Sequence, residues 1–438
     1  MKILIKNANI IDPINEVHGK YDLLIANQKI SKIASDISLD NKIKKEYKII
    51  DLNGKYLLPG LIDMHTHLRE PGFEEKETIK SGCEAAAAGG FTTIACMPNT
   101  KPVADNDATI EYIKSKATNA LVKVVPIASI TKNSAGKELA EIGFLKKAGV
   151  MALSDDGNPV MDSEIMRRAM EYASSFALPI ISHCEDINLV AGGVMNEGYI
   201  STILGLKGIP AAAEEIMISR DIILAEFTGA SLHIAHISTK RGLEMVAEAK
   251  SRGIKVTAEV TPHHLLLNDE VVKGYNPDTK VNPPLRSEED MIALQQALKE
   301  GLIDVIATDH APHTYEDKLG EYDYAAFGIS GLESAISLIY SKFINNDIIA
   351  FDDLIYLMGK NPAKILGLDF PGIKENAIAD LLVFDSEVNW TLTKDKLKSK
   401  GKNTPFAGEK MQGKVVMTIV DGKIVYNDFE GKGEVYYD

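Results

Sequence analysis

The sequence predicts an α/β protein: a (β/α)8 barrel, also called a TIM barrel, with a small β-sandwich domain formed from both termini. Two observations predict this architecture. Through the middle of the chain, short apolar segments rich in β-branched residues alternate with segments of helical periodicity, whereas both ends contain strand-like segments alone. The length of 438 residues accommodates one large barrel with an added small domain.

Both ends of the chain are predicted to form short strands. Apolar and polar residues alternate near the N-terminus, with Asn, Gly and Asp in the turns, and strands return near the C-terminus. The last two of these strands are separated by Asp421–Gly422, a pair typical of a tight β-hairpin. Because the two ends share this character, we expect residues 1–54 and 377–438 to form one composite β-rich domain and residues 55–376 to form the barrel.

Eight strand-like segments in the middle of the chain are the predicted barrel strands. They are residues 57–68, 91–98, 122–129, 149–156, 178–185, 231–238, 254–262 and 303–313. Segments with helical spacing follow them, for example residues 76–88, 162–176, 211–227 and 288–301. Asp162–Ser163 and Ser287 stand where two of these helices begin and are suitable N-caps. Successive strand–helix units of this kind are typical of a TIM barrel.

Composition excludes several classes of protein. Lys and Arg total 48 against 62 Asp and Glu, so the net charge of −14 argues against a nucleic-acid partner. Apolar runs are interrupted well before the ~20 residues of a membrane span, and the first residues do not have the pattern of a signal peptide. Three cysteines are too few for a disulfide scaffold and fit a reducing compartment. We therefore expect a soluble, cytoplasmic protein without a membrane partner.

Potential metal ligands fall at the ends of several predicted strands. His65 and His67 end the first strand one residue apart, so strand alternation places them on one face together with Arg69. Further candidates at strand ends are Asp155, Asp156, His183, His236 and Asp309. The C-terminal ends of barrel strands meet at one mouth, where imidazole nitrogens and carboxylate oxygens would suit zinc. Packing alone is a poor explanation for four histidines and an aspartate in such positions.

Several longer motifs carry a family resemblance. PGLIDMHTHLREPG, GGFTTIACMPNT, SHCED, HIAHIST, VNPPLR and ATDHAPH together resemble the class I dihydroorotases of the amidohydrolase superfamily. The resemblance extends over essentially the whole chain. A His-x-His motif alone is weak, but its combination with His183, His236 and Asp309 in register with eight strands is specific.

The resemblance implies a zinc centre with one or two ions per subunit. By resemblance, His65 and His67 bind one zinc, His183 and His236 bind the second, and Asp309 holds the first metal and exchanges protons with the substrate. Many superfamily members bridge the metals with a carboxylated lysine, but here the fourth strand ends in Ser-Asp-Asp-Gly. Alignment with one branch of the family points to Asp156 as the bridge, whereas strand alternation leaves both Asp155 and Asp156 open.

Substrate recognition is assigned to four further residues. Arg69 offers a fork of donors that matches a carboxylate, and related allantoinases tend to carry Asn at this position. The resemblance adds Asn99 and Asn282 as substrate contacts. His313 lies in the segment 311–325, which we expect to form a loop over the barrel mouth.

The function implied is that of a dihydroorotase: reversible cyclisation of N-carbamoyl-L-aspartate to L-dihydroorotate in de novo pyrimidine (UMP) biosynthesis. One alternative is an allantoinase or hydantoinase acting on another cyclic amide, and Arg69 argues against it. A second is a weakly active homologue that scaffolds a partner from the pyrimidine pathway, and the intact set of ligands argues against that. A homodimer is typical of the family, and association with aspartate carbamoyltransferase is a further expectation.

Overall fold

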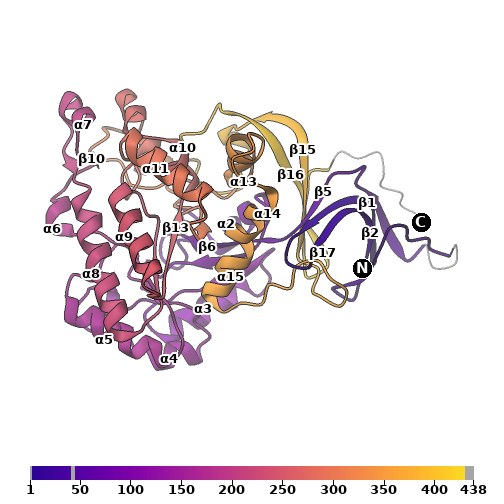
Figure 1. Ribbon diagram of the computed structural model, residues 1–438, viewed down its shortest axis with the longest axis horizontal. Coiled ribbons are helices and arrows are strands. Elements are labelled where there is room, and N and C mark those ends of the chain that lie inside the picture. The colour runs from indigo at the N-terminus through magenta and orange to yellow at the C-terminus, as the bar shows by residue number, and fades with distance from the viewer. Residues whose placement is uncertain (1, 41–44, 430–438) are drawn as a thin grey trace.

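The computed structural model describes residues 2–40 and 45–429. Parallel strands surrounded by helices occupy one end of the molecule, and a curved sheet occupies the other (Figure 1). Residues 1, 41–44 and 430–438, which belong to the predicted β-rich domain, lie outside the described residues. Within the described ranges, no helix has the length and apolar character that crossing a membrane requires.

The two ends of the described chain meet in one mixed sheet of eight strands. Its strands are β1 (Lys2–Asp12), β2 (Val17–Ala26), β3 (Lys29–Ala34), β4 (Tyr47–Asp51), β5 (Tyr56–Pro59), β15 (Leu381–Thr391), β16 (Lys410–Val420) and β17 (Lys423–Asn427). The order is β17-β16-β15-β5-β1-β2-β3, and β4 pairs in parallel with β1. Because β15 pairs antiparallel with β5, the expected β-sandwich takes the form of one continuous sheet in this part of the chain.

Local sequence accounts for the turn between the last two strands of this sheet. Asp421 and Gly422, between β16 and β17, have φ values of 48° and 69°. Two positive φ values in succession are what a two-residue type I′ hairpin requires, so the predicted turn is confirmed. Ile3, Ile5 and Ile10 of β1 are buried in the core of the sheet.

Seven strands in the middle of the chain form two parallel sheets. The first contains β6 (Leu61–Thr66), β7 (Phe91–Cys96) and β8 (Lys123–Pro126), and the second contains β9 (Ile180–Ser182), β12 (Leu232–Ile234), β13 (Val256–Val260) and β14 (Val305–Ile306). Isolated parallel bridges connect them: Leu153 pairs with Ala128 and Ile180 on one side, and Thr66 pairs with His310 on the other.

The predicted strand 149–156 is reduced to the bridge at Leu153. Beyond Leu153, the carboxylate of Asp155 accepts hydrogen bonds from the backbone N–H groups of Ile130 and Thr131, at 2.7 and 3.1 Å. A side chain here satisfies donors that a longer strand would pair with main-chain carbonyls, so the strand ends early.

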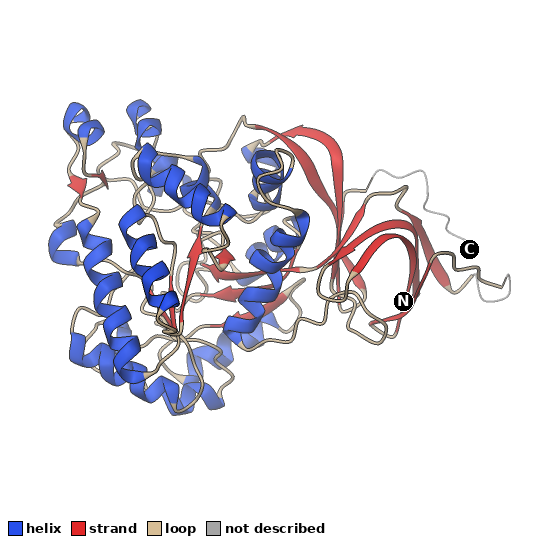
Figure 2. Ribbon diagram, in the orientation of Figure 1, coloured by secondary structure: helices blue, strands red, loops and turns tan. Residues whose placement is uncertain are grey.

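Helices lie around the outside of the parallel strands (Figure 2). The longer ones are α2 (Ile79–Ala88), α3 (Asp107–Ala117), α5 (Ser163–Ser174), α8 (Ala212–Thr228), α9 (Lys240–Ser251) and α11 (Glu288–Lys299). The shorter ones are α4 (Ile142–Lys147), α6 (Ile187–Val190), α7 (Tyr199–Leu204), α10 (Pro262–Leu266), α12 (Tyr315–Lys318), α13 (Ala335–Ile339), α14 (Phe351–Ile355) and α15 (Asn361–Leu366), with a two-strand ladder of β10 (Met195–Asn196) and β11 (Gly208–Ile209). Asp162 accepts hydrogen bonds from two N–H groups of α5, and Ser287 accepts one from α11, so both predicted N-caps are confirmed.

Side chains from the parallel segments also pack against one another. Met64, Ala95, Val125, Ala152, Ile181, Ala235 and Val305 belong to one buried cluster. Each comes from a different predicted barrel strand, so these segments share one inner face. Their ends are thereby held close together, and the polar residues that follow them gather at one site.

Candidate metal centre

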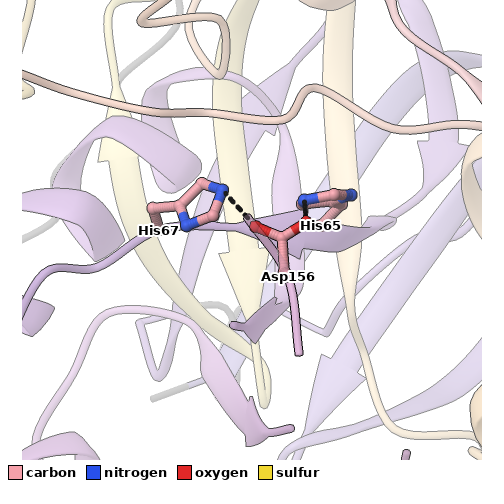
Figure 3. A group of neighbouring side chains, drawn as sticks. All are labelled: His65, His67 and Asp156. Carbon is pink, nitrogen blue, oxygen red and sulfur yellow. Dashed lines mark ion pairs between the residues drawn. The ribbon is translucent and has the colours of Figure 1, made fainter. Parts of the chain in front are cut away.

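Two groups of buried ligands lie beyond the ends of the parallel strands. His65, His67 and Asp156 form the first group, and Asp156, His183 and His236 form the second. Within each group the ligand atoms lie within 4.8 Å of one another. His65 lies near the end of β6 and His67 directly follows the strand, and the two approach the carboxylate of Asp156 from two sides (Figure 3). Asp156 is therefore common to both groups.

The distances around Asp156 suit a shared ligand. Its Oδ1 lies 3.4 Å from His65 Nε2 and 3.7 Å from His236 Nε2, and its Oδ2 lies 3.5 Å from His67 Nε2. His65 Nε2 and Asp156 Oδ1 are buried and have no hydrogen-bond partner among the described residues. Buried polar atoms without partners are costly, whereas imidazole nitrogen and carboxylate oxygen are good ligands for a divalent ion. The donor set therefore fits two metal ions sharing Asp156.

Asp309 lies against the first group. Its Oδ1 is 3.0 Å from His67 Nε2 and 3.5 Å from His65 Nε2. Burial would raise the pKa of Asp309, but the imidazoles of His65 and His67 outweigh this effect and lower the pKa to about 2. Burial would likewise raise the pKa of Asp156, yet its histidine neighbours hold the pKa well below the usual range. Both side chains are therefore carboxylates near neutral pH.

Asp155 faces away from this centre. Its carboxylate accepts hydrogen bonds from the Ser129 and Thr131 hydroxyl groups as well as from two backbone N–H groups. These contacts use both of its oxygens in holding the loop that follows β8. Of the two aspartates that strand alternation left open, Asp156 is the one next to the histidines.

The centre opens into a cavity of about 200 Å³. Among the predicted substrate residues, Arg69, Asn99 and Asn282 line it, together with Phe327 and Gly328. Arg69 Nε donates to Pro312 O at 3.2 Å, which ties the guanidinium to the segment over the mouth. Asn282 Nδ2 donates to Glu185 Oε2 at 3.2 Å, and Asn282 Oδ1 has no partner in the described part of the chain.

Asn99 contacts the predicted metal ligands as well as the cavity. Its Oδ1 accepts a hydrogen bond from His67 Nδ1 at 2.9 Å, and its Nδ2 lies 3.3 Å from Asp156 Oδ2. The first contact places the proton of His67 on Nδ1 and leaves Nε2 available as a ligand. Asn99 can therefore orient His67 in addition to contacting a molecule bound in the cavity.

His313 is not part of the cavity lining. Its Nε2 donates to Phe327 O at 2.8 Å, just after the segment 311–325. Burial, followed by the positive charges of Arg69 and Lys76, lowers the pKa of His313 to about 3. A neutral His313 thus lies behind Arg69 and secures the loop that carries Phe327.

Two acidic residues at the centre are not revealed by the sequence patterns. Glu185 lies 3.3 Å from His183 Nε2, and Glu259 is fully buried with an oxygen 2.5 Å from His65 Nδ1. The proximity of Glu185 to His183 in the SHCED motif was an available signal. Glu259 gave none, because an acidic residue within a strand is usually expected on the solvent side.

These features define the class of the protein: an α/β enzyme with two buried His/Asp metal-binding groups beyond its strand ends. A family profile described as "Dihydro-orotase-like" matches residues 54–242. Dihydroorotase of Syntrophus aciditrophicus (strain SB) is 52% identical over 98% of this chain and 100% of its own length. That of Thermoanaerobacter sp. (strain X514) is 53% identical over 97% of each chain. The chain belongs to the dihydroorotase family of the amidohydrolase superfamily.

Solved structures support the same fold. L-Hydantoinase (dihydropyrimidinase) from Arthrobacter aurescens superposes with a TM-score of 0.87 at 24% identity, covering 98% of this chain and 96% of that one. Dihydropyrimidinase from Brevibacillus agri NCHU1002 gives a TM-score of 0.84 at 23% identity, covering 100% and 97%. At this level of identity the likeness concerns the fold alone.

Proposed function

We propose that the protein catalyses the reversible cyclisation of N-carbamoyl-L-aspartate to L-dihydroorotate, with release of water, in de novo pyrimidine (UMP) biosynthesis. The observation that carries this proposal is the similarity to dihydroorotases over nearly the whole chain. The two His/Asp groups and the cationic side chain of Arg69 at the cavity agree with it.

We also propose that the parallel segments close into a (β/α)8 barrel. Residues 55–376 would form the barrel, and residues 1–54 and 377–438 the composite β-rich domain. The parallel bridges at Leu153 and between Thr66 and His310 support closure, because they link the two sheets on both sides. The shared inner face of the strands supports it independently.

Zinc is the proposed metal. His65, His67 and Asp309 would hold one ion, His183 and His236 would hold the other, and Asp156 would bridge them. Neutral imidazoles with carboxylates are the ligands that zinc takes in hydrolytic enzymes. When bound, the metal supplies Lewis-acid activation of water and of the amide carbonyl.

Asp309 is the proposed proton carrier. As a carboxylate at neutral pH, it can accept the proton that leaves the attacking water when the ring opens, and then deliver it from Oδ to the departing amide nitrogen. In the cyclisation direction the same oxygen accepts the proton of the carbamoyl nitrogen as that nitrogen attacks the side-chain carboxyl group. Asp309 then passes this proton to the carboxyl oxygen that departs, and that oxygen is released as water.

Arg69 is proposed to bind the carboxylate that remains outside the reacting amide. Because His313 Nε2 donates to Phe327 O, it cannot also accept from Arg69, and the Nη hydrogens of Arg69 stay available to a ligand. Asn282 Oδ1 can accept from a ring N–H, and Asn99 can add a contact beside the metal ligands. Holding the substrate at several points converts a loose encounter into an oriented attack.

The test is to measure dihydroorotate hydrolysis and N-carbamoyl-L-aspartate cyclisation with one purified sample whose metal content is determined in parallel. We expect activity in both directions, loss of activity with a chelator, and recovery with zinc at about two ions per chain. Hydrolysis of hydantoin, allantoin or dihydrouracil in preference to dihydroorotate would replace the proposal by a different cyclic amidohydrolase.

Assembly and location are part of the same proposal. We propose a cytoplasmic homodimer; the three cysteines are buried and unpaired, as suits a reducing compartment. Aspartate carbamoyltransferase is the partner protein whose association should be tested. Activity that emerges only when that enzyme is added would favour the scaffolding alternative over an autonomous enzyme.

A further inference from the structure

Glu259 is a buried carboxylate that the proposed mechanism does not use. It lies on β13, is fully enclosed, and its side chain contacts three groups at the centre of the parallel strands. Oε1 lies 2.5 Å from His65 Nδ1 and 3.2 Å from the backbone N of His236, and Oε2 lies 3.1 Å from His233 Nε2. An isolated charge in this position would be costly, so these three donors account for its presence.

The contacts fix where the protons lie. A carboxylate only accepts hydrogen bonds, so His65 must carry its proton on Nδ1 and keep a lone pair on Nε2. His65 Nε2 has no hydrogen-bond partner in the described part of the chain and lies 3.4 Å from Asp156 Oδ1. Glu259 therefore selects the one neutral form of His65 that can bind a metal on the side of Asp156.

His233 and Thr257 hold Glu259 from behind. His233 donates from Nε2 to Glu259, and its Nδ1 lies 2.8 Å from the Thr257 hydroxyl. The same hydroxyl is 3.5 Å from Leu232 O, so the ring nitrogen is its nearer acceptor. Protons thus point in one direction from Thr257 through His233 to Glu259. His233 therefore has a defined task, which is to hold Glu259 in place.

The same carboxylate reaches the second group through the backbone. His236 has φ of 33°, in the left-handed region that residues other than glycine rarely adopt. Such a conformation is strained and persists only where surrounding contacts maintain it. The hydrogen bond from His236 N to Glu259 Oε1 is one such contact. Glu259 therefore contacts a ligand of each group, His65 by its side chain and His236 by its main chain.

We propose that Glu259 is a positioning residue for both metal groups, held in place by His233 and Thr257. It sets the proton position of His65 and the backbone of His236, and so raises the affinity of both groups for zinc. This inference rests on the proposed assignment of His65 and His236 as ligands, but it does not depend on which cyclic amide is the substrate.

The test is zinc affinity of the metal-free protein, measured by competition with a chromophoric chelator. Glu259→Gln keeps the shape of the side chain but replaces one acceptor oxygen by a donor, which opposes either His65 Nδ1–H or His233 Nε2–H. We expect zinc to bind about 10- to 100-fold more weakly. The visible absorption bands of the cobalt-substituted protein should also shift, because the geometry around His65 changes. Generic loss of stability would not shift these bands.

Two further variants keep the test decisive. Thr257→Val removes only the distant hydroxyl, and we expect a smaller loss of zinc affinity, below about tenfold, in a protein that folds normally. Asp12→Asn is the control, since Asp12 is a fully buried, hydrogen-bonded carboxylate in the terminal sheet. The zinc affinity of this variant should equal that of the wild type.

Each result has a distinct meaning. Zinc constants within twofold of wild type and an unchanged cobalt spectrum in Glu259→Gln would overturn the inference. If Glu259→Gln does not fold, wild-type zinc constants and cobalt bands in Thr257→Val would overturn it instead. If His65→Ala and His236→Ala bind zinc as tightly as the wild type, the proposed ligand assignment itself fails.

Discussion

At the scale of single residues, adjacent side chains of one type have separate tasks. Asp155 and Asp156 are both buried, yet one hydrogen-bonds to the loop after β8 and the other lies among four histidines. The two aspartates differ in task because their neighbouring groups differ, since the side chains themselves are identical. A carboxylate surrounded by N–H and O–H donors stabilises the fold, whereas one surrounded by imidazoles is suited to hold a metal.

Replacing the two aspartates in turn separates these tasks. Asp155→Asn loses acceptors for buried donors, so the free energy of unfolding should fall by about 1–3 kcal/mol while zinc content is unchanged. Asp156→Asn should lower zinc affinity at least about tenfold with little effect on the unfolding of the metal-free protein. Chemical denaturation and metal analysis measure both quantities. Loss of zinc in Asp155→Asn alone would reverse the assignment.

Arg69 provides the second prediction at this scale. Removing a charge-assisted, forked contact costs about 1.5–3 kcal/mol, so Arg69→Ala should raise KM for dihydroorotate about 10- to 100-fold. The inhibition constant of dihydrouracil, which lacks the carboxylate, should change less than about threefold. Arg69→Lys, which keeps the charge without the fork, should be intermediate. Equal effects on both compounds would argue against carboxylate recognition.

At the scale of elements, two buried lysines hold residues 311–328, which comprise the predicted loop 311–325 and the three residues after it. Lys318 of α12 donates to Ala326 O at 2.7 Å and to Pro277 O at 3.0 Å. Lys280 donates to Tyr322 O and Asp323 O, both at 2.9 Å. Lys280 lies outside the segment and binds two of its carbonyls, whereas Lys318 lies within the segment and binds one carbonyl inside it and one outside it. The segment carries Phe327 and Gly328, which line the cavity, so its position defines the shape of the site.

Lys318→Met should loosen this segment. Burial lowers the pKa of Lys318 to about 7, so its hydrogen bonds are only partly charge-assisted at neutral pH. Losing them should cost about 1–3 kcal/mol, so local opening should become about 5- to 100-fold more frequent. Faster proteolytic cleavage between residues 311 and 328, together with a raised KM, would report it. Lys342→Met is the matched control, because Lys342 is exposed and pairs only with Glu409 among the contacts described for it. Unchanged cleavage in Lys318→Met would exclude the proposed role of the lysine.

At the scale of the whole molecule, the connection between β15 and β16 returns to the α/β part of the chain. There Glu333, just before α13, accepts hydrogen bonds from the backbone N–H groups of Lys398 and Ser399, at 2.7 and 3.1 Å. Burial raises the pKa of Glu333 from 4.5 to about 7, in spite of these donors. The junction between the terminal sheet and the helices therefore contains a carboxyl group that is protonated at mildly acidic pH.

This junction should make stability depend on pH. Between pH 4.5 and 7 the folded chain keeps the Glu333 proton that the unfolded chain releases, so the free energy of unfolding falls as pH rises and levels off above about 7. The shift limits the effect to ~3 kcal/mol, and solvent at the partly exposed carboxyl group reduces it further.

Glu333→Gln should remove this dependence. The difference in unfolding free energy between wild type and variant, measured by urea denaturation of metal-free protein, should therefore decline from pH 4.5 to 8. A constant difference for Glu333→Gln would contradict the prediction.

The sequence by itself determined the α/β alternation, the strands of both ends, the Asp421–Gly422 hairpin and the N-caps at Asp162 and Ser287. These are local features, because they depend on residues within one turn or one strand. The histidines at strand ends could also be found from sequence, since the ends of successive parallel strands lie at the same edge.

Only the tertiary structure decided the contacts between distant parts of the chain. Strand alternation could not choose between Asp155 and Asp156, because the strand ends at Leu153 and hydrogen bonds to another loop set the direction of each side chain. Glu259 meets His65 across 194 residues of sequence, and His313 lies behind Arg69 across 244. The physical reason is that a buried polar group takes its partner from whatever segment packing brings next to it, and no local pattern specifies that segment.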